Sequence, residues 1–152
     1  MPKPLIFLDA DVIFAGSASS SQHGASLVVL RMGEITLLDC ITSEQAITEV
    51  ERNLAAKLPA KLPDFRLLVS RCLRVVPDPE PDDLLPWHGQ ADPKDLPLLV
   101  AARREGCSHL LTFNTRHYFP AIDISSSKTT IVVQRPGQFL LSVRTLLGQM
   151  KP

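Results

Sequence analysis

The stretch Leu5-Ile6-Phe7-Leu8-Asp9-Ala10-Asp11 decides the fold. Its four apolar residues form a short continuous run that ends directly in an acid, which favours a strand buried on both faces of a sheet. In an open α/β sheet, ligands bind at the edge where the carboxyl ends of the strands meet. We therefore predict a strand over residues 5–8 that carries Asp9, and Asp11 two residues on, to a ligand-binding edge.

Apolar runs alternate with helical patterns along the rest of the chain. Short β-like runs predict strands at 35–38, 73–76, 110–113 and 129–133. Helical patterns predict helices at 25–31, from 42 or 43 to about 58, at 65–72, after Asp95 and after Pro136. Segments 16–24 and 77–86 are predicted loops. This alternation indicates an α/β fold: a single three-layer domain over residues 1–152, with a mostly parallel central sheet flanked by helices.

Two helix starts carry specific signals. Thr42-x-x-Gln45 has the spacing of a capping box, and Ser43 is the alternative cap. Asp95 suits the N-cap of a later helix because it places Pro97 in the first turn, where a missing N–H costs nothing. The apolar residues of the earlier helix recur at helical intervals and predict a core-facing stripe: Ile47, Val50, Leu54 and Leu58.

The composition is that of a globular domain without a strong charge. Hydrophobic residues make up 45% of 152 residues and charged residues 21%, which argues against disorder. Sixteen basic and sixteen acidic residues cancel, so the chain is not a polycation that binds nucleic acid by charge alone. Residues 51–74 hold six bases against two acids, which we interpret as a solvated helical face in preference to an RNA path.

The cysteines and the apolar segments bear on the compartment. Cys40, Cys72 and Cys107 are odd in number and lack C-x-x-C spacing, so they indicate neither a disulfide framework nor a zinc site. No apolar run has the length of a signal peptide or a membrane span. These observations predict a cytoplasmic protein that makes no membrane contact.

Oxygen-bearing side chains stand at the landmarks of the predicted fold. Asp9 and Asp11 follow the first strand, Glu49 lies within a helix, Asp95 begins another helix, and Asn114 ends a strand. Carboxylates supply the oxygen ligands and the countercharge that Mg²⁺ or Mn²⁺ requires. We expect the common edge of the strands to bring these side chains together.

Each candidate also has a purely structural interpretation. Glu49 points away from the apolar stripe of its helix, as a surface acid would, and Glu51 lies closer to that stripe. Asn114 is a favoured turn residue. We interpret Asp92 as a solvated neighbour of the site or as a group that supports a metal ligand. We interpret His117 as a packing residue near aromatic side chains in preference to a phosphate contact.

Four segments together resemble a PIN domain, the nuclease fold of the VapC-type toxins of toxin–antitoxin pairs. They are LIFLDADVIFAG (5–16), TSEQAITEVERNL (42–54), DPKDLPLLVAARREGCSHLLTFNTRHYFP (92–120) and RPGQFLLSV (135–143). The resemblance implies that Asp9, Glu49 and Asp95 are catalytic, metal-binding acids that hold Mg²⁺ or Mn²⁺. It further implies a metal-dependent endoribonuclease with an RNA substrate, a homodimer, and a cognate antitoxin that blocks the site.

The sequence departs from the family pattern at two positions. Asn114 stands where the family more often has Asp, so a metal ligand there would contribute an amide oxygen without charge. Asp11 stands where the family commonly has Asn, and its carboxylate compensates in part for the missing charge.

Two other functions fit some of these residues. A PIN-like domain weakened by the loss of the acid at position 114 would bind RNA or a partner without cutting it. Asp9-Ala-Asp11-Val also resembles the first motif of haloacid-dehalogenase-like phosphatases, in which the first Asp is a nucleophile. That family requires a late acidic pair after a strand, whereas Asp92 and Asp95 precede a predicted helix.

Overall fold

A parallel sheet forms the centre of the molecule. A computed structural model of the chain describes residues 3–18, 24–119 and 131–149, with side chains described as far as residue 145 in the last helix. Within these residues five strands pair in the order β3-β2-β1-β4-β5, all of them parallel. The strands are β1 (Leu5–Leu8), β2 (Asp39–Ser43), β3 (Arg74–Val76), β4 (His109–Leu111) and β5 (Val132–Gln134).

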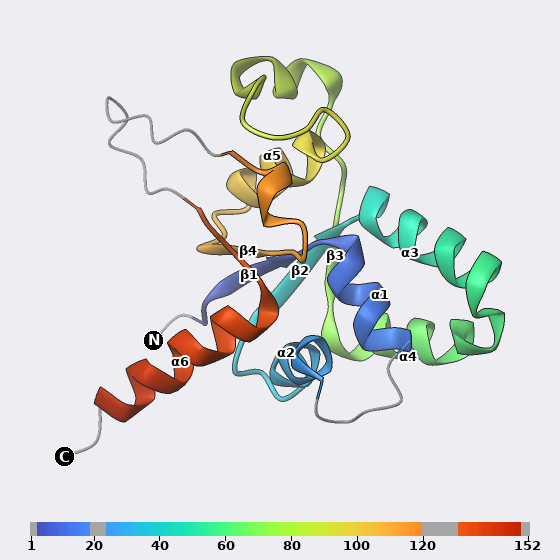
Figure 1. Cartoon of the computed structure of the whole chain (residues 1–152). Coiled ribbons are helices and arrows are strands. Elements are labelled where there is room, and N and C mark those ends of the chain that lie inside the picture. The colour runs from blue at the N-terminus through green and yellow to red at the C-terminus, as the bar shows by residue number, and fades with distance from the viewer. Residues whose placement is uncertain (1–2, 19–23, 120–130, 150–152) are drawn as a thin grey trace.

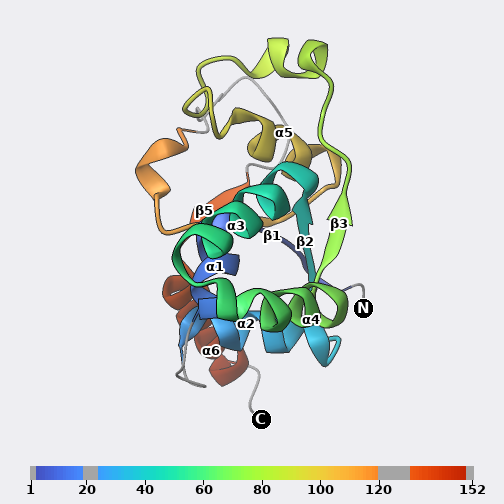
Figure 2. The same ribbon diagram turned by 90° about the vertical axis from the view of Figure 1, so that its right-hand side faces the viewer.

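Helices cover both faces of the sheet and give the three-layer α/β fold that the sequence predicts. The α-helices are α1 (Ala10–Ala18), α2 (Ala25–Glu34), α3 (Glu44–Lys57), α4 (Leu62–Cys72), α5 (Leu96–Arg104) and α6 (Pro136–Gln149). Short 3-10 helices are η1 (Pro59–Lys61), η2 (Pro81–Trp87) and η3 (Thr115–His117). Figures 1 and 2 show α5 and η2 on one side of the sheet, and α1, α2 and α4 on the other.

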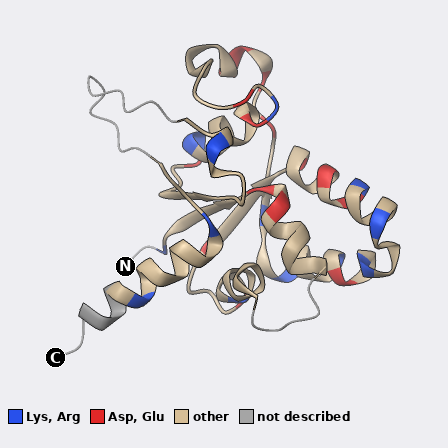
Figure 3. Ribbon diagram, in the orientation of Figure 1, with Lys and Arg blue, Asp and Glu red and all other residues tan. Residues whose placement is uncertain are grey.

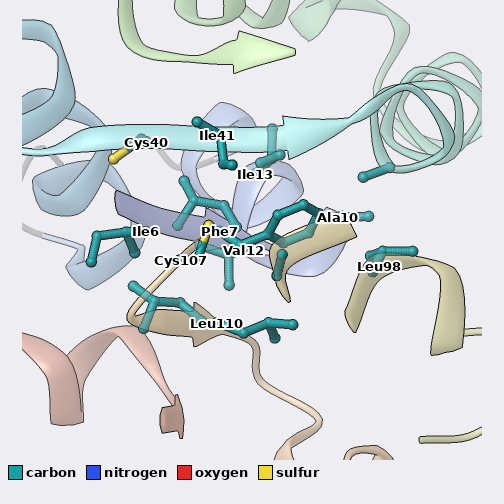
Figure 4. Close-up of a cluster of buried hydrophobic side chains, with 14 of the residues drawn as sticks. Ile6, Phe7, Ala10, Val12, Ile13, Cys40, Ile41, Leu98, Cys107 and Leu110 are labelled. Atoms are coloured by element: carbon teal, nitrogen blue, oxygen red, sulfur yellow. The ribbon is translucent and has the colours of Figure 1, made fainter. Parts of the chain in front are cut away.

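The central strand β1 is buried on both faces, as its continuous apolar run predicts. Phe7 pairs with Ile41 of β2 on one side and with Leu110 of β4 on the other. All three side chains are fully buried, and Figure 4 shows them within one apolar cluster. Because successive strand residues point to opposite faces, β1 joins the core above the sheet to the core below it.

The predicted strand at 35–38 is wrong. Ile35 and Leu37 are 62% and 57% exposed, and the strand that pairs with β1 begins at Asp39. Residues 35–38 are more apolar than the strand Asp39–Ser43, which contains polar residues such as Thr42. That residue tolerates full burial because its Oγ1 donates a hydrogen bond of 2.8 Å to the Leu8 carbonyl.

Helix α1 is absent from the sequence prediction, which placed a loop over 16–24. The chain enters this helix immediately after Asp9, whose carbonyl accepts hydrogen bonds from the amides of Val12 and Ile13. Val12 and Ile13 are fully buried. The small and serine-rich residues that follow gave the loop prediction, and its residues 19–23 lie outside the described chain. The early helix start places Asp11 in the first helical turn.

The start of α3 follows the alternative cap. Ser43 Oγ accepts a hydrogen bond of 3.3 Å from the Ala46 amide, so Ser43 and not Thr42 is the N-cap. Val50 and Leu54 are buried as predicted and Ile47 is partly buried, but Leu58 is 40% exposed because the helix ends before it.

The remaining element predictions agree in type and differ in extent. Helix α5 begins after Asp95, yet the Asp95 side chain forms no capping hydrogen bond. Strand β4 ends at Leu111, two residues short of the prediction, and η2 lies in the predicted loop 77–86. Residues 129 and 130 of the last predicted strand lie outside the described chain, as do the side chains of Leu146 and Leu147. Among the helices that the structure describes, none is long and apolar enough to cross a membrane.

Candidate metal centre

The parallel pairing of β1 and β4 brings Asp9 beside the residues that follow β4. The Asp9 amide donates to the Leu111 carbonyl at 3.0 Å, which extends the β1–β4 pairing by one residue. Asp9 Oδ2 accepts two hydrogen bonds, from Thr112 Oγ1 at 2.9 Å and from the Tyr118 hydroxyl at 3.0 Å. Its Oδ1 accepts from the Ala10 amide at 2.6 Å. Asp9 is 7% exposed, so these contacts hold the carboxylate in one orientation.

Asp11 is held by the turn after β4. Its Oδ2 accepts from the Phe113 amide at 3.0 Å and from Asn114 Nδ2 at 3.2 Å, and it lies 3.3 Å from Thr112 Oγ1, whose single proton it shares with Asp9. Its Oδ1 is buried, and no hydrogen-bond partner for it lies within residues 3–18, 24–119 and 131–149. A buried carboxylate oxygen without a partner is unusual in a folded protein and points to a missing cation or water.

A second group of ligand atoms lies where α5 begins. His117 Nδ1 is 3.2 Å from Asp95 Oδ2 and 3.7 Å from Asp92 Oδ2. Ligand atoms of these three residues all lie within 4.8 Å of one another, which suits a metal ion. The Asp92 amide also donates to the His117 carbonyl at 2.8 Å, so the backbone fastens η3 to the segment before α5.

Burial and mutual repulsion raise the pKa values of the clustered acids Asp9, Asp11 and Asp95. Burial and the charge of Asp11 raise the pKa of Asp9 to about 7, against the opposing hydrogen bonds from Thr112 and Tyr118. Burial also raises the pKa of Asp11 and that of Asp95, although His117 works against the shift at Asp95. The charge of Asp95 contributes to the raised pKa of Asp9, so the two groups of ligand atoms share one electrostatic environment.

Glu49 lies at the margin of this arrangement. Its Oε1 is 3.6 Å from Lys94 Nζ, and its side chain is 30% exposed. Its charge raises the pKa of Asp95, but its carboxylate does not join the group formed by Asp92, Asp95 and His117. The structure therefore brings Asp9, Asp11 and Asn114 into contact through the turn after β4, and places Asp95 and Glu49 along the same edge.

Three residues at the centre are absent from the sequence prediction as site residues. Thr112 links Asp9 to Asp11, Tyr118 orients Asp9, and His117 contacts Asp95 where packing was predicted. All three belong to the stretch that follows β4, and they surround Asn114. A polar run Thr-x-Asn-x-x-His-Tyr directly after a buried strand was the available signal, because that position is the ligand-binding edge.

The donor set fits a hard divalent cation. Carboxylate oxygens of Asp9, Asp11 and Asp95 face a common edge, and within the described residues no Lys or Arg lies within 4.0 Å of any of them. Figure 3 shows the acidic segment at the start of α1 close to the end of the sheet. An unpartnered carboxylate oxygen beside two further acids is what Mg²⁺ or Mn²⁺ would satisfy.

Fold and site together define an α/β protein with a carboxylate-rich centre at the carboxyl edge of its sheet. A sequence profile described as PIN domain matches residues 5–116. The chain belongs to the PIN domain family. No curated protein matches the chain at a significant level.

Two solved structures share the fold at low sequence identity. VapC20 of Mycobacterium tuberculosis, described as a toxin that cleaves the sarcin–ricin loop, is 18% identical with a TM-score of 0.53, covering 84% of this chain and 98% of its own. VapBC2 of Rickettsia felis, bound to a DNA fragment from its promoter, is 12% identical with a TM-score of 0.58, covering 86% of this chain and 97% of its own. The PIN-like fold predicted from sequence is thereby confirmed, and the dehalogenase-like alternative gains no support.

Proposed function

We propose that this PIN domain is a metal-dependent endoribonuclease, the VapC-type toxin of a toxin–antitoxin pair. The observation that carries the proposal is the cluster of carboxylates at the strand edge, where burial raises the pKa of Asp9 and that of Asp11 and where no Lys or Arg among the described residues forms an ion pair with either acid. A metal-dependent nuclease needs acids in its site because they bind the cation. The bound cation then offsets the repulsion between these acids and the anionic phosphodiester. The family membership and the fold of the VapC structures support the same function.

Asp9, Glu49 and Asp95 are the proposed catalytic acids, with Asp11 and Asn114 beside them. Asp9 and Asp95 would hold Mg²⁺ or Mn²⁺, and the unpartnered Oδ1 of Asp11 is a further ligand atom. When bound, the ion activates water for in-line attack on an RNA phosphodiester. Asn114 donates a hydrogen bond from its amide nitrogen to Asp11, and its Oδ1 is a neutral ligand atom in this proposal.

The other side chains of the centre orient these acids. Thr112 and Tyr118 both donate to Oδ2 of Asp9, which fixes the plane of the carboxylate. His117 holds Asp95, and its backbone contact with Asp92 keeps that acid in place. Such fixed orientation is how a protein tunes a metal ligand from outside the coordination sphere.

The same proposal includes an antitoxin partner, a homodimer and a cytoplasmic location. The likeness to a VapBC structure supports a cognate antitoxin, and we propose a cytoplasmic homodimer whose site that antitoxin covers. A PIN domain that binds RNA without cutting it is the second candidate, favoured by the neutral Asn114 in place of an acid.

Cleavage of single-stranded RNA with Mn²⁺, Mg²⁺ or EDTA tests the proposal. Asp9→Asn and Asp95→Asn should each abolish cleavage while keeping the fold, and Asp64→Asn, on the exposed face of α4, should leave it unchanged. Metal-dependent cleavage that survives both substitutions contradicts the assignment. RNA binding without cleavage by the wild-type protein favours the second candidate.

A further inference from the structure

A polar hollow of about 470 Å³ adjoins the acidic edge. It lies between α3, the segment after β3 and the segment before α5, and Glu49 belongs to both the hollow and the acidic edge. The lining residues are Gln45, Thr48, Glu49, Arg52, Asn53, Asp78 and Lys94.

One face of α3 forms the long wall of this hollow. Its lining residues are Gln45, the pair Thr48 and Glu49, and the pair Arg52 and Asn53, which follow one another at helical intervals of three to four positions and so lie on one side of the helix. The opposite side packs into the core through Ala46, Val50 and Leu54, all fully buried. The wall is therefore anchored, and Figure 3 shows acidic and basic segments following one another along it.

The two acids of the hollow are already engaged. Asp78 Oδ1 accepts from the Gln45 amide at 2.9 Å, and Glu49 pairs with Lys94 at 3.6 Å. Gln45 Nε2 also donates to the Lys94 carbonyl at 3.1 Å, which fastens the segment before α5 onto α3. Contacts from α3 thus hold both of the other segments that line the hollow.

Three lining side chains remain without partners. Among residues 3–18, 24–119 and 131–149, Arg52 has no carboxylate within 4.0 Å, and Thr48 and Asn53 form no side-chain hydrogen bond. Together they offer one guanidinium, one hydroxyl and one amide: Thr48 is next to Glu49 in the chain, and Arg52 and Asn53 lie about one helical turn from it. A guanidinium matches a phosphate, and an amide matches the hydrogen-bonding edge of a base.

We propose that this hollow binds the nucleotide next to the scissile phosphate of single-stranded RNA. Arg52 contacts the phosphate of that nucleotide, and Thr48 and Asn53 hydrogen-bond to its ribose and base. The inference rests on the proposed nuclease function and deepens it. A hollow of this volume can hold one nucleotide. Proteins recognise RNA sequence mainly on unpaired, unstacked bases, so we expect the bound RNA to be single-stranded.

Two groups of residues along one edge then have separate tasks. The acids beside β1 and α5 act at the scissile phosphate, and the hollow positions the neighbouring nucleotide. Loss of Arg52 should therefore weaken RNA binding without changing the affinity for the metal ion. Loss of Asn53 should change the base preference at one position of the cleaved site.

Binding of single-stranded RNA oligonucleotides, measured in an Asp95→Asn background to prevent cleavage, tests the first expectation. Arg52→Ala should weaken binding about tenfold, and should reduce the slope of log K against log salt by about 0.7, the value for one phosphate contact on a single strand. Lys57→Ala is the matched control, since it removes one positive charge from the same helix outside the hollow. Equal RNA affinity and equal salt slope for the two variants would overturn the inference.

Kinetics in the otherwise wild-type protein distinguish this inference from the proposed function. Arg52→Ala should raise KM with little change in kcat, and its Mn²⁺ affinity by calorimetry should equal that of wild type. RNA that is cleaved with the same KM by Arg52→Ala and Lys57→Ala refutes the subsite and leaves the nuclease intact. RNA that is bound through Arg52 but never cleaved refutes the nuclease and leaves the subsite intact.

Discussion

Exchanging the side chains of Asp11 and Asn114 tests how the acidic edge is assembled. Asn114 Nδ2 donates to Asp11 Oδ2 at 3.2 Å, so one residue supplies the charge and the other the donor. In Asn114→Asp the donor becomes an acceptor, and two carboxylates face each other across the same gap. The double variant, Asp11→Asn with Asn114→Asp, again has one charged acceptor and one amide donor in the pair, with their positions exchanged.

The magnitudes follow from distance and exposure. Two like charges about 4 Å apart repel by about 1 kcal/mol in water and by about 4 kcal/mol at the effective dielectric constant of a protein surface. Because Asn114 is exposed and Asp11 only partly buried, we take about 1–2 kcal/mol for repulsion. Loss of the hydrogen bond to a charged group adds about 1 kcal/mol after the same allowance. Asn114→Asp should therefore destabilise the metal-free fold by about 2–3 kcal/mol.

Asp11→Asn should cost less. It removes the charged acceptor of the Phe113 amide, but it also removes the cost of burying a charged carboxylate, which is the cost that raises the pKa of Asp11. We therefore expect a loss of about 1 kcal/mol in the free energy of unfolding. If the pair acts as a unit, the double variant should also lose about 1 kcal/mol, which leaves a coupling of about 2–3 kcal/mol.

Urea unfolding of the wild type, the two single variants and the double variant in EDTA measures the coupling. In millimolar Mn²⁺ the loss of unfolding free energy in Asn114→Asp should be smaller, because the ion neutralises the added charge. Asn53→Asp, at the other asparagine of the chain, is the control and should add independently to Asp11→Asn. Free energies for the Asp11 and Asn114 substitutions that add within about 0.5 kcal/mol would refute the reasoning.

Three further perturbations address the same architecture. Because burial raises the pKa of Asp9 from 3.8 to about 7, the part of the metal-free stability that depends on Asp9 should be fully present below about pH 4 and lost as pH rises through 7, and Asp9→Asn should lack this component in melting curves. Mn²⁺ affinity should run the opposite way, falling about tenfold per pH unit below 7 because protons compete for the carboxylate, and a calorimetric affinity independent of pH would contradict this. Tyr118→Phe should cost about 1–2 kcal/mol in urea unfolding and move the midpoint of the Mn²⁺ affinity profile to higher pH, since Asp9 loses a donor; an unmoved midpoint would show that Tyr118 only packs. Gly33→Ala should destabilise by about 1–3 kcal/mol despite better helix propensity, because its Cβ would lie 2.7 Å from the Cys72 carbonyl oxygen, whereas Gly137→Ala meets nothing and should be tolerated.

Local sequence determined the fold class and the position of its central strand. An uninterrupted run such as 5–8 has few uses other than a strand buried on both faces, and the acid after it had to emerge at the carboxyl edge. Helix α3 was predicted because its apolar period and its cap agree, and helix α5 was predicted because Asp95 places Pro97 in the first turn.

Strand β2 and helix α1 required the tertiary structure. The exposed Ile35 and Leu37 are more β-like than Asp39–Ser43, and only pairing with β1 decides which run enters the sheet. The small residues of α1 carry a weak helical signal on their own, and the helix is supported by the burial of Val12 and Ile13 against neighbouring elements.

The sequence picked out three acids of the candidate centre, and the tertiary structure decided how they are held and brought Asp92 and His117 beside them. Asp9, Asp11 and Asp95 could be picked out because each stands at the end of an element. The contacts of Thr112, Tyr118 and His117 join residues about a hundred positions apart or cross from η3 to α5. Such contacts depend on which strands are neighbours, and β1 and β4 become neighbours only when the whole sheet has formed.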